Sequence, residues 1–291
     1  MKFEELGIGL NTYNSEKYIR TLMDSITSQK YKNFKLYVLD NQSTDKTKKI
    51  IYSYKSKINI KFVTDTTKRD IPSSQKKLIN TYLLNHKYSM IINDDDKYNS
   101  NYISKLIKHL NLGQHDMVYS NFNFFNEQQT IKAKNKPIYN SNKFINVINF
   151  YIYRNVVPIC FGIYKSKAIV DAIKFFNPDR ISKTNYDNQF ILHFLANYRI
   201  GYIKEKLFNY FIKNRIEINK GKKKNIYRLD KSLYLIFLIQ FIFAKNFFLI
   251  IYNNSYFNFL QKLFIFFIIP IIYFQKCLSY ISKYLLRKFL H

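Results

Sequence analysis

The chain has 291 residues, 47% of them hydrophobic and 18% aromatic, which excludes a disordered protein and allows a substantial core. Its 47 Lys and Arg against 19 Asp and Glu give a net charge of +28, which favours polyanionic partners: nucleic acid, anionic lipid or a phosphorylated substrate. Its two cysteines, Cys160 and Cys277, match no metal-binding spacing, argue against a disulfide framework and indicate a reducing compartment.

The first half of the chain alternates short apolar runs with amphipathic stretches. A buried strand is predicted at 6–10, and Ser15 is expected to cap the helix that follows it. Further strands are predicted at 35–39, 58–63, 88–92 and 116–120, with helices around 78–83 and 103–110. This alternation predicts an α/β fold with a parallel, doubly wound sheet.

Polar clusters follow three of the predicted strands. They are Asn11–Asn14, Asp40–Asp45 and Asp94–Asp96. An isolated run of three acids is most often a solvated turn. Ligands of open α/β sheets bind at the carboxyl ends of strands, however, so three clusters at one edge indicate a site. The sequence has no glycine-rich phosphate loop. Adjacent carboxylates offer an alternative, because one or two of them can bind a divalent cation whose remaining ligands are diphosphate oxygens.

Segments in the right order along residues 5–215 resemble a family 2 glycosyltransferase of the GT-A fold. They read IGLNTYNSEKYI, KLYVLDNQSTDKT, YSMIINDDDKYNSNYISKL, and FGIYKSKAI followed by SKTNYDNQFILHFL. The resemblance implies a single, mostly parallel sheet flanked by helices, and an enzyme that uses a nucleotide-sugar donor.

The resemblance also implies residues that bind the nucleotide. Tyr13 would stack on the base, with Asn11 beside it, and Asp40 would accept a hydrogen bond from a base N–H. Lys77 matches a position where the family usually places an arginine near the nucleotide. Asp94 would contact the ribose.

The same resemblance assigns a metal and a general base. Mn²⁺ or Mg²⁺ would be bound by Asp95 and Asp96, and Asp187 would take the proton of the acceptor hydroxyl. The family commonly reads Asp-x-Asp-Asp where this chain has Asn93 first, so the register within Asp94–Asp96 stays open. Asp187 could instead be an ordinary acid at a helix N-terminus, and Asp179 is then the alternative base.

The composition changes after the predicted catalytic domain, which we place at 1–220. The remaining segment, 221–291, contains apolar runs at 232–244 and 263–274 bordered by lysines. Both are shorter than the ~20 residues that a spanning helix needs, and Pro270 further weakens a spanning interpretation. We expect interfacial helices on an anionic membrane surface, and the alternative is a hydrophobic core or dimer interface.

The predicted function is inverting transfer from a nucleotide-sugar, UDP-sugar favoured, to a hydroxyl of a glycan or lipid-linked acceptor in bacterial surface polysaccharide or lipooligosaccharide synthesis. The first residues lack the pattern of a signal peptide, so the expected location is the cytoplasmic face of the inner membrane. A nucleotidyltransferase with a metal–Asp site is one alternative. A nucleic-acid-binding protein is the other, but three acids in the binding crevice would repel phosphates, so no nucleic-acid partner is expected.

Overall fold

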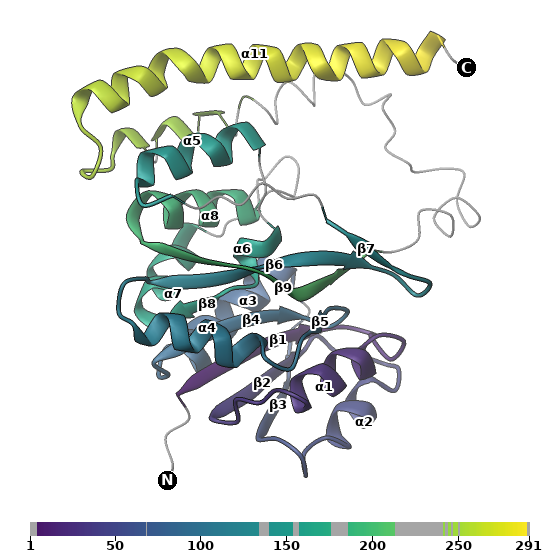
Figure 1. Cartoon of the computed structure of the whole chain (residues 1–291). Coiled ribbons are helices and arrows are strands. Elements are labelled where there is room, and N and C mark those ends of the chain that lie inside the picture. The colour runs from purple at the N-terminus through teal and green to yellow at the C-terminus, as the bar shows by residue number, and fades with distance from the viewer. Residues whose placement is uncertain are drawn as a thin grey trace.

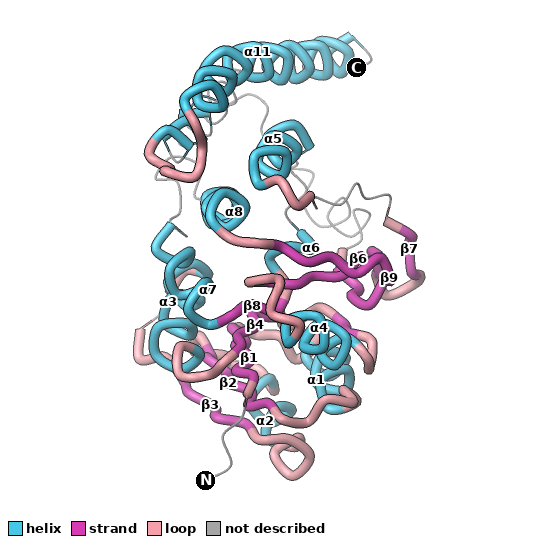
Figure 2. The backbone as a smooth tube through the Cα atoms, turned by 60° about the vertical axis from the view of Figure 1, so that its left-hand side comes forward, coloured by secondary structure: helices cyan, strands magenta, loops and turns pink. Residues whose placement is uncertain are grey.

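The structure is a computed structural model in which one sheet separates two layers of helices (Figures 1 and 2). It describes residues 5–67, 69–133, 140–153, 157–175, 186–212, 241, 244–245, 247–249 and 251–289. The alternative base Asp179 and residues 232–240 of the first apolar run lie outside the described residues.

Four parallel strands form one half of the sheet. They are β1 (Leu6–Thr12), β2 (Phe34–Asp40), β3 (Ile60–Thr64) and β4 (Tyr88–Asn93), in the order β3-β2-β1-β4. Their registers pair Thr12 with Asp40 and Asn11 with Asn93, so the strands end at the same level. This half confirms the predicted parallel arrangement, including the expectation that the polar clusters share one edge.

The other half of the sheet is mixed. β8 (Ile163–Lys165) pairs antiparallel with β4 and with β6 (Met117–Phe125), and β9 (Ile200–Phe211) then runs parallel to β6. Two short strands, β5 (Lys97–Tyr98) and β7 (Thr130–Lys132), complete the sheet. The strict doubly wound pattern therefore ends at β4, because a strand from much later in the chain takes the place beside it.

The helices are divided between the two faces (Figure 2). One face carries α1 (Ile19–Thr27), α2 (Thr47–Tyr52) and α4 (Tyr102–Asn111). The other carries α3 (Ile71–Leu78), its π-helical continuation Ile79–Leu83, α5 (Lys143–Tyr153), α6 (Val157–Cys160), α7 (Ser166–Ala172), the 3-10 turn Ile173–Phe175 and α8 (Tyr186–Asn197). Buried apolar residues form one cluster on each face.

The predicted cap at Ser15 is wrong, because α1 begins four residues later and Tyr18 occupies its N-cap position. The Ser15 carbonyl accepts hydrogen bonds from the Tyr18 and Ile19 N–H groups at 2.9 Å, which forms a tight turn before the helix. The Ser15 hydroxyl is instead hydrogen-bonded to the Asp94 carboxylate. Ser15, although a typical capping residue, therefore binds the acidic turn after β4 through its side chain.

The C-terminal helix α11 (Phe259–Phe289) has 31 residues and continues through Pro270. It lies beyond α5, on the side of the molecule away from α1 and α2 (Figure 1). The apolar run 263–274 is thus part of a helix that extends beyond the run at both ends. Within the described residues, Phe259–Ser279 is the one stretch long and apolar enough to cross a membrane by length and composition.

Candidate active site

A cavity of about 760 Å³ opens at the carboxyl ends of β1, β2 and β4. Five residues of the predicted site line it, namely Asn11, Tyr13, Asp94, Asp95 and Asp187. The other three, Asp40, Lys77 and Asp96, do not reach its wall. The structure therefore brings the predicted general base, part of the predicted metal turn and part of the predicted nucleotide pocket to one cavity.

The three acids after β4 have different surroundings. Asp94 and Asp95 line the cavity, and burial raises the pKa of Asp94 although the Ser15 hydroxyl opposes that rise. Asp96 is fully buried, and its Oδ1 accepts the Phe211 N–H at 3.0 Å. Burial, and next the nearby charge of Asp95, raise the pKa of Asp96 well above its usual value. Asp95 is thus better placed than Asp96 to meet a ligand in the cavity.

This turn suits a cation that is shared with a substrate. Within the described residues, no group of three His, Cys, Asp or Glu side chains could hold a metal by itself. Mg²⁺ is usually bound through one or two carboxylates plus substrate phosphates, and Asp94 and Asp95 supply such hard oxygen donors. The residues fit a divalent cation that binds together with a diphosphate, and they do not form a closed metal cage.

Asp187 reaches the same cavity from the first turn of α8. Burial raises its pKa, and the N–H groups of Asp187 and Asn188 only partly oppose this effect. A carboxylate with a raised pKa is a better proton acceptor than an exposed one. Phe190 and Cys160 line the same cavity.

The base-binding residues predicted from the resemblance divide into two groups. Tyr13 is on the cavity wall with 44% of its surface exposed, so its ring is accessible to a base. The Asn11 side chain is on the same wall, and its buried Oδ1 has no hydrogen-bond partner among the described residues. Asp40 is buried, and its carboxylate accepts the Ser43 N–H at 3.1 Å and the Ser43 hydroxyl. In this structure Asp40 shapes the turn after β2.

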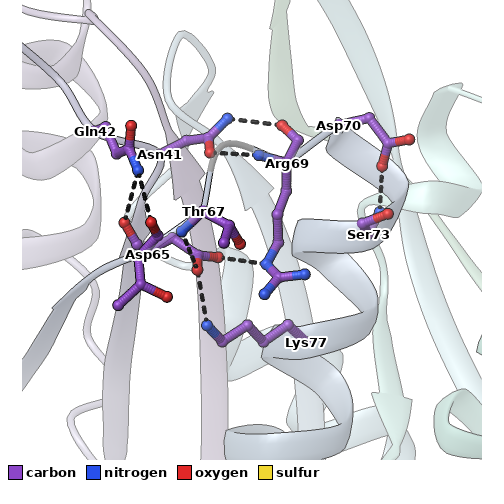
Figure 3. Close-up of polar contacts among 9 residues, drawn as sticks. Asn41, Gln42, Asp65, Thr67, Arg69, Asp70, Ser73 and Lys77 are labelled. Carbon is purple, nitrogen blue, oxygen red and sulfur yellow. Dashed lines mark hydrogen bonds and ion pairs between the residues drawn. The ribbon is translucent and has the colours of Figure 1, made fainter.

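Lys77 belongs to a polar cluster around Asp65, at the end of β3 (Figure 3). Asp65 has a fully buried side chain that accepts hydrogen bonds from Lys77 Nζ at 3.0 Å and from Arg69 Nε at 2.7 Å. Burial works to raise the pKa of Asp65, but the hydrogen bonds from Lys77 and Arg69 hold it below its usual value. Lys77 is therefore bonded to Asp65 and does not line the cavity.

Arg69 is a residue of the site that the sequence interpretation missed. It lines the cavity, and its backbone N–H and C=O are bonded to the Asn41 side chain at 2.9 and 2.7 Å (Figure 3). Asp70 then caps α3 by accepting the Ser73 N–H at 2.8 Å. The signal was present, because Asp-Ile-Pro is a helix-start pattern and places Arg69 just before a helix, beyond a strand end.

The family model described as glycosyl transferase family 2 matches residues 8–170, more than half of the chain. The chain belongs to glycosyl transferase family 2. The family predicted from its sequence motifs is thereby confirmed.

Two curated relatives are transferases from bacteria. Poly(ribitol-phosphate) beta-N-acetylglucosaminyltransferase TarS of Staphylococcus aureus is 41% identical over 63 residues, which is 21% of this chain and 10% of TarS. Glycosyltransferase GlyA of Streptococcus pneumoniae serotype 4 is 24% identical over 126 residues, 43% of this chain and 18% of GlyA. The matched segments thus span less than a fifth of either relative.

Solved structures share the fold of this family 2 member. S. aureus TarS 1–349 in complex with UDP-GlcNAc matches with a TM-score of 0.67 and 18% identity, over 89% of this chain and 69% of that one. The mannosyltransferase PcManGT from Pyrobaculum calidifontis, in complex with GDP-Man and Mn²⁺, matches with a TM-score of 0.50 and 13% identity, over 72% and 58%. At these identities the likeness concerns the fold, and the predicted fold class is confirmed.

Proposed function

We propose that this family 2 glycosyltransferase transfers a sugar with inversion from a UDP-sugar to a hydroxyl of a glycan or lipid-linked acceptor, in the synthesis of a bacterial surface polysaccharide or lipooligosaccharide. The observation that carries the proposal is the shared cavity of Asp94, Asp95 and Asp187. Two acids at the end of β4 and one on α8 provide a place for the leaving diphosphate and a base for the attacking hydroxyl.

The donor's nucleotide is proposed to occupy the part of the cavity between Tyr13 and Arg69. Tyr13 offers a ring for stacking, Asn11 offers an amide oxygen that has no partner among the residues described, and Arg69 offers positive charge to phosphate. A uridine nucleotide is favoured because TarS structures contain UDP-GlcNAc and UDP. Asp40 and Lys77 remain predicted nucleotide-binding residues, although neither lines the cavity in this structure.

At the anomeric carbon, the proposed reaction forms one bond and breaks one. The acceptor oxygen attacks the anomeric carbon, its proton passes to Asp187, and the bond from that carbon to the diphosphate oxygen breaks with its electron pair on the diphosphate. Asp94 and Asp95 would hold Mn²⁺ or Mg²⁺ against the diphosphate. The bound cation would stabilise the negative charge that develops on the diphosphate in the transition state. Such electrostatic stabilisation is usually the largest single contribution to catalysis.

The proposed location is the cytoplasmic face of the inner membrane, with the C-terminal segment in contact with anionic lipid. The segment's exposed apolar residues and its lysines support this location. A lipid-linked acceptor would be available at that surface.

The test is a donor screen on the purified full chain. UDP-, GDP-, CMP- and dTDP-sugars are added with Mn²⁺ and with EDTA, and thermal shift and product release are measured. We expect a shift with one nucleotide class that requires the metal, and release of the nucleoside diphosphate. Release of pyrophosphate would indicate the nucleotidyltransferase instead. Binding of polynucleotide that weakens steeply with salt, without turnover of any sugar nucleotide, would indicate the nucleic-acid binder.

A further inference from the structure

Exposed apolar side chains are concentrated at the C-terminal end of the chain. Of the twenty large apolar side chains that are exposed among the described residues, thirteen lie between 241 and 278. The outer face of α11 includes Leu260, Phe267 and Phe274, exposed by 72%, 62% and 66%. These three are one heptad apart and therefore point in nearly the same direction. A surface of this kind marks an interaction site.

The opposite face of α11 is part of the protein core. Ile265, Ile269 and Ile272 are buried in the same apolar cluster as residues of α5 and α8. Tyr151 of α5 also donates a hydrogen bond from its hydroxyl to the Ile269 carbonyl, at 3.3 Å. If α11 left the domain to cross a bilayer, this apolar surface would lose its packing against α5 and α8, and Tyr151 would lose its hydrogen bond to Ile269, which is costly.

The net charge of the C-terminal segment indicates which partner the outer face of α11 binds. Residues 231–291 contain seven Lys and Arg and no Asp or Glu. A second copy of the chain would bring two such basic segments together, and like charges repel. An anionic lipid surface attracts each basic residue by about 1 kcal/mol.

We infer that α11 lies in the plane of an anionic bilayer, its outer face in the boundary between headgroups and acyl chains, and its inner face still packed on α5 and α8. This inference deepens the proposed membrane location and rests on it. Helices of this type are buried by ~5–10 Å along their whole length. The catalytic domain is then fixed against the membrane as one unit with its anchor.

The absence of tryptophan from the chain allows a direct test. Leu260→Trp, Phe267→Trp and Phe274→Trp each introduce a single fluorophore on the outer face of the full-length protein. Tyr52→Trp, at an exposed position of α2, is the matched control. Each variant is mixed with vesicles of phosphatidylglycerol and phosphatidylcholine brominated at shallow or deep acyl positions, and quenching is measured.

In-plane binding predicts that shallow bromines quench all three outer-face tryptophans best, and that the control is not quenched. Because 260 and 274 are separated by fourteen residues, a crossing helix would place them ~21 Å apart in depth. A graded depth would overturn the in-plane arrangement while leaving membrane binding intact. Absence of quenching, together with a dimer in sedimentation, would overturn the lipid partner in favour of a second copy. Neither result depends on sugar transfer, which the donor screen measures separately.

Discussion

The pKa values of Asp65 and Asp187 are shifted in opposite directions because the hydrogen-bond partners of the two carboxylates differ. Asp65 is ionised and held by Lys77 and Arg69, which keep its pKa low against the effect of burial. Asp187 has no such cation in the described part of its surroundings, and burial raises its pKa. Asp65 therefore provides a negative charge that holds Arg69 and Lys77, whereas Asp187 provides a proton acceptor in the cavity.

At the residue scale, Asp187→Asn is expected to lower the transfer rate by ~10²–10⁴-fold, because it keeps the size of the side chain but removes the proton acceptor. Binding of donor and metal should change little. Single-turnover rates and donor titration measure the two effects. The control is Asp179→Asn, at the alternative base. If that variant is inactive and Asp187→Asn is not, the assignment of the base is wrong.

The raised pKa of Asp187 also predicts how activity and stability depend on pH. The base must be ionised, so kcat/KM should fall as the pH drops through this raised value, at a higher pH than for an ordinary aspartate. A folded-state pKa above the unfolded one means that stability is lost as the pH rises through it. Asp187→Asn should therefore melt at the same or a higher temperature than wild type at neutral pH. A clearly lower melting temperature would show that Asp187 is structurally required.

The acidic turn gives a matched pair of substitutions. Asp95→Asn should remove the dependence of donor binding on Mn²⁺ or Mg²⁺, because Asp95 lines the cavity. Asp96→Asn should leave that dependence in place, because the Asp96 side chain is buried and bonded to the Phe211 N–H. Isothermal titration of UDP-sugar with and without EDTA measures both. If Asp96→Asn also loses the metal dependence, Asp96 is a ligand, as the sequence resemblance implies.

At the element scale, the buried carboxylate of Asp65 links the connection between β3 and α3 to the Arg69 and Lys77 side chains. Asp65→Asn should weaken donor binding as much as Arg69→Ala does, because Arg69 loses the partner of its Nε. The double substitution should add little to either single one, which is the mark of residues that act as a unit. Donor dissociation constants of the three variants measure this.

Asp116→Asn is the matched control for the β3–α3 connection. Asp116 also binds two cations, with Lys165 Nζ at 3.0 Å and Arg199 Nε at 3.5 Å, but it does not line the cavity. It is expected to change stability without changing the donor dissociation constant. Equal losses of donor affinity in both variants would mean that Asp65 acts only through the fold.

The sequence predicts elements well where periodicity alone decides them. The parallel strands from β1 to β4 and the helix α4 lie where their apolar patterns indicate. It fails where a long-range contact competes with a local rule. Ser15 is a good capping residue, yet its hydroxyl is bonded to Asp94, 79 positions away. The place of β8 between β4 and β6 likewise depends on tertiary packing that no local pattern contains.

The candidate site follows the same division. Residues at strand ends, such as Asn11, Tyr13 and Asp95, are predictable because parallel strands bring their carboxyl ends together. The helix-start pattern places Arg69 just before α3, but Lys77 is also basic and belongs to that helix, so the sequence does not show which of the two lines the cavity. In the structure both side chains are bonded to the buried Asp65, and Arg69 is the one that lines the cavity.

At the scale of the whole molecule, the C-terminal helix is packed into the core of the transferase. Residues Phe247, Ile251 and Phe257, which precede α11, are buried in the same cluster as α5 and α8. The predicted division at residue 220 would separate catalysis from the membrane contact that we propose. A deletion at that point would also remove part of the apolar cover of α5.

Two substitutions on opposite faces of α11 separate these roles. Ile269→Ala removes a buried side chain and should lower the free energy of unfolding by ~2–5 kcal/mol. Phe267→Ser changes an exposed side chain and should alter that free energy by no more than ~0.5 kcal/mol. Binding to anionic vesicles should show the reverse order, with Phe267→Ser the weaker binder. Chemical denaturation and vesicle sedimentation measure the two quantities. If Ile269→Ala has wild-type stability, α11 is not held by the catalytic domain, and it is then free to leave α5 and cross the bilayer.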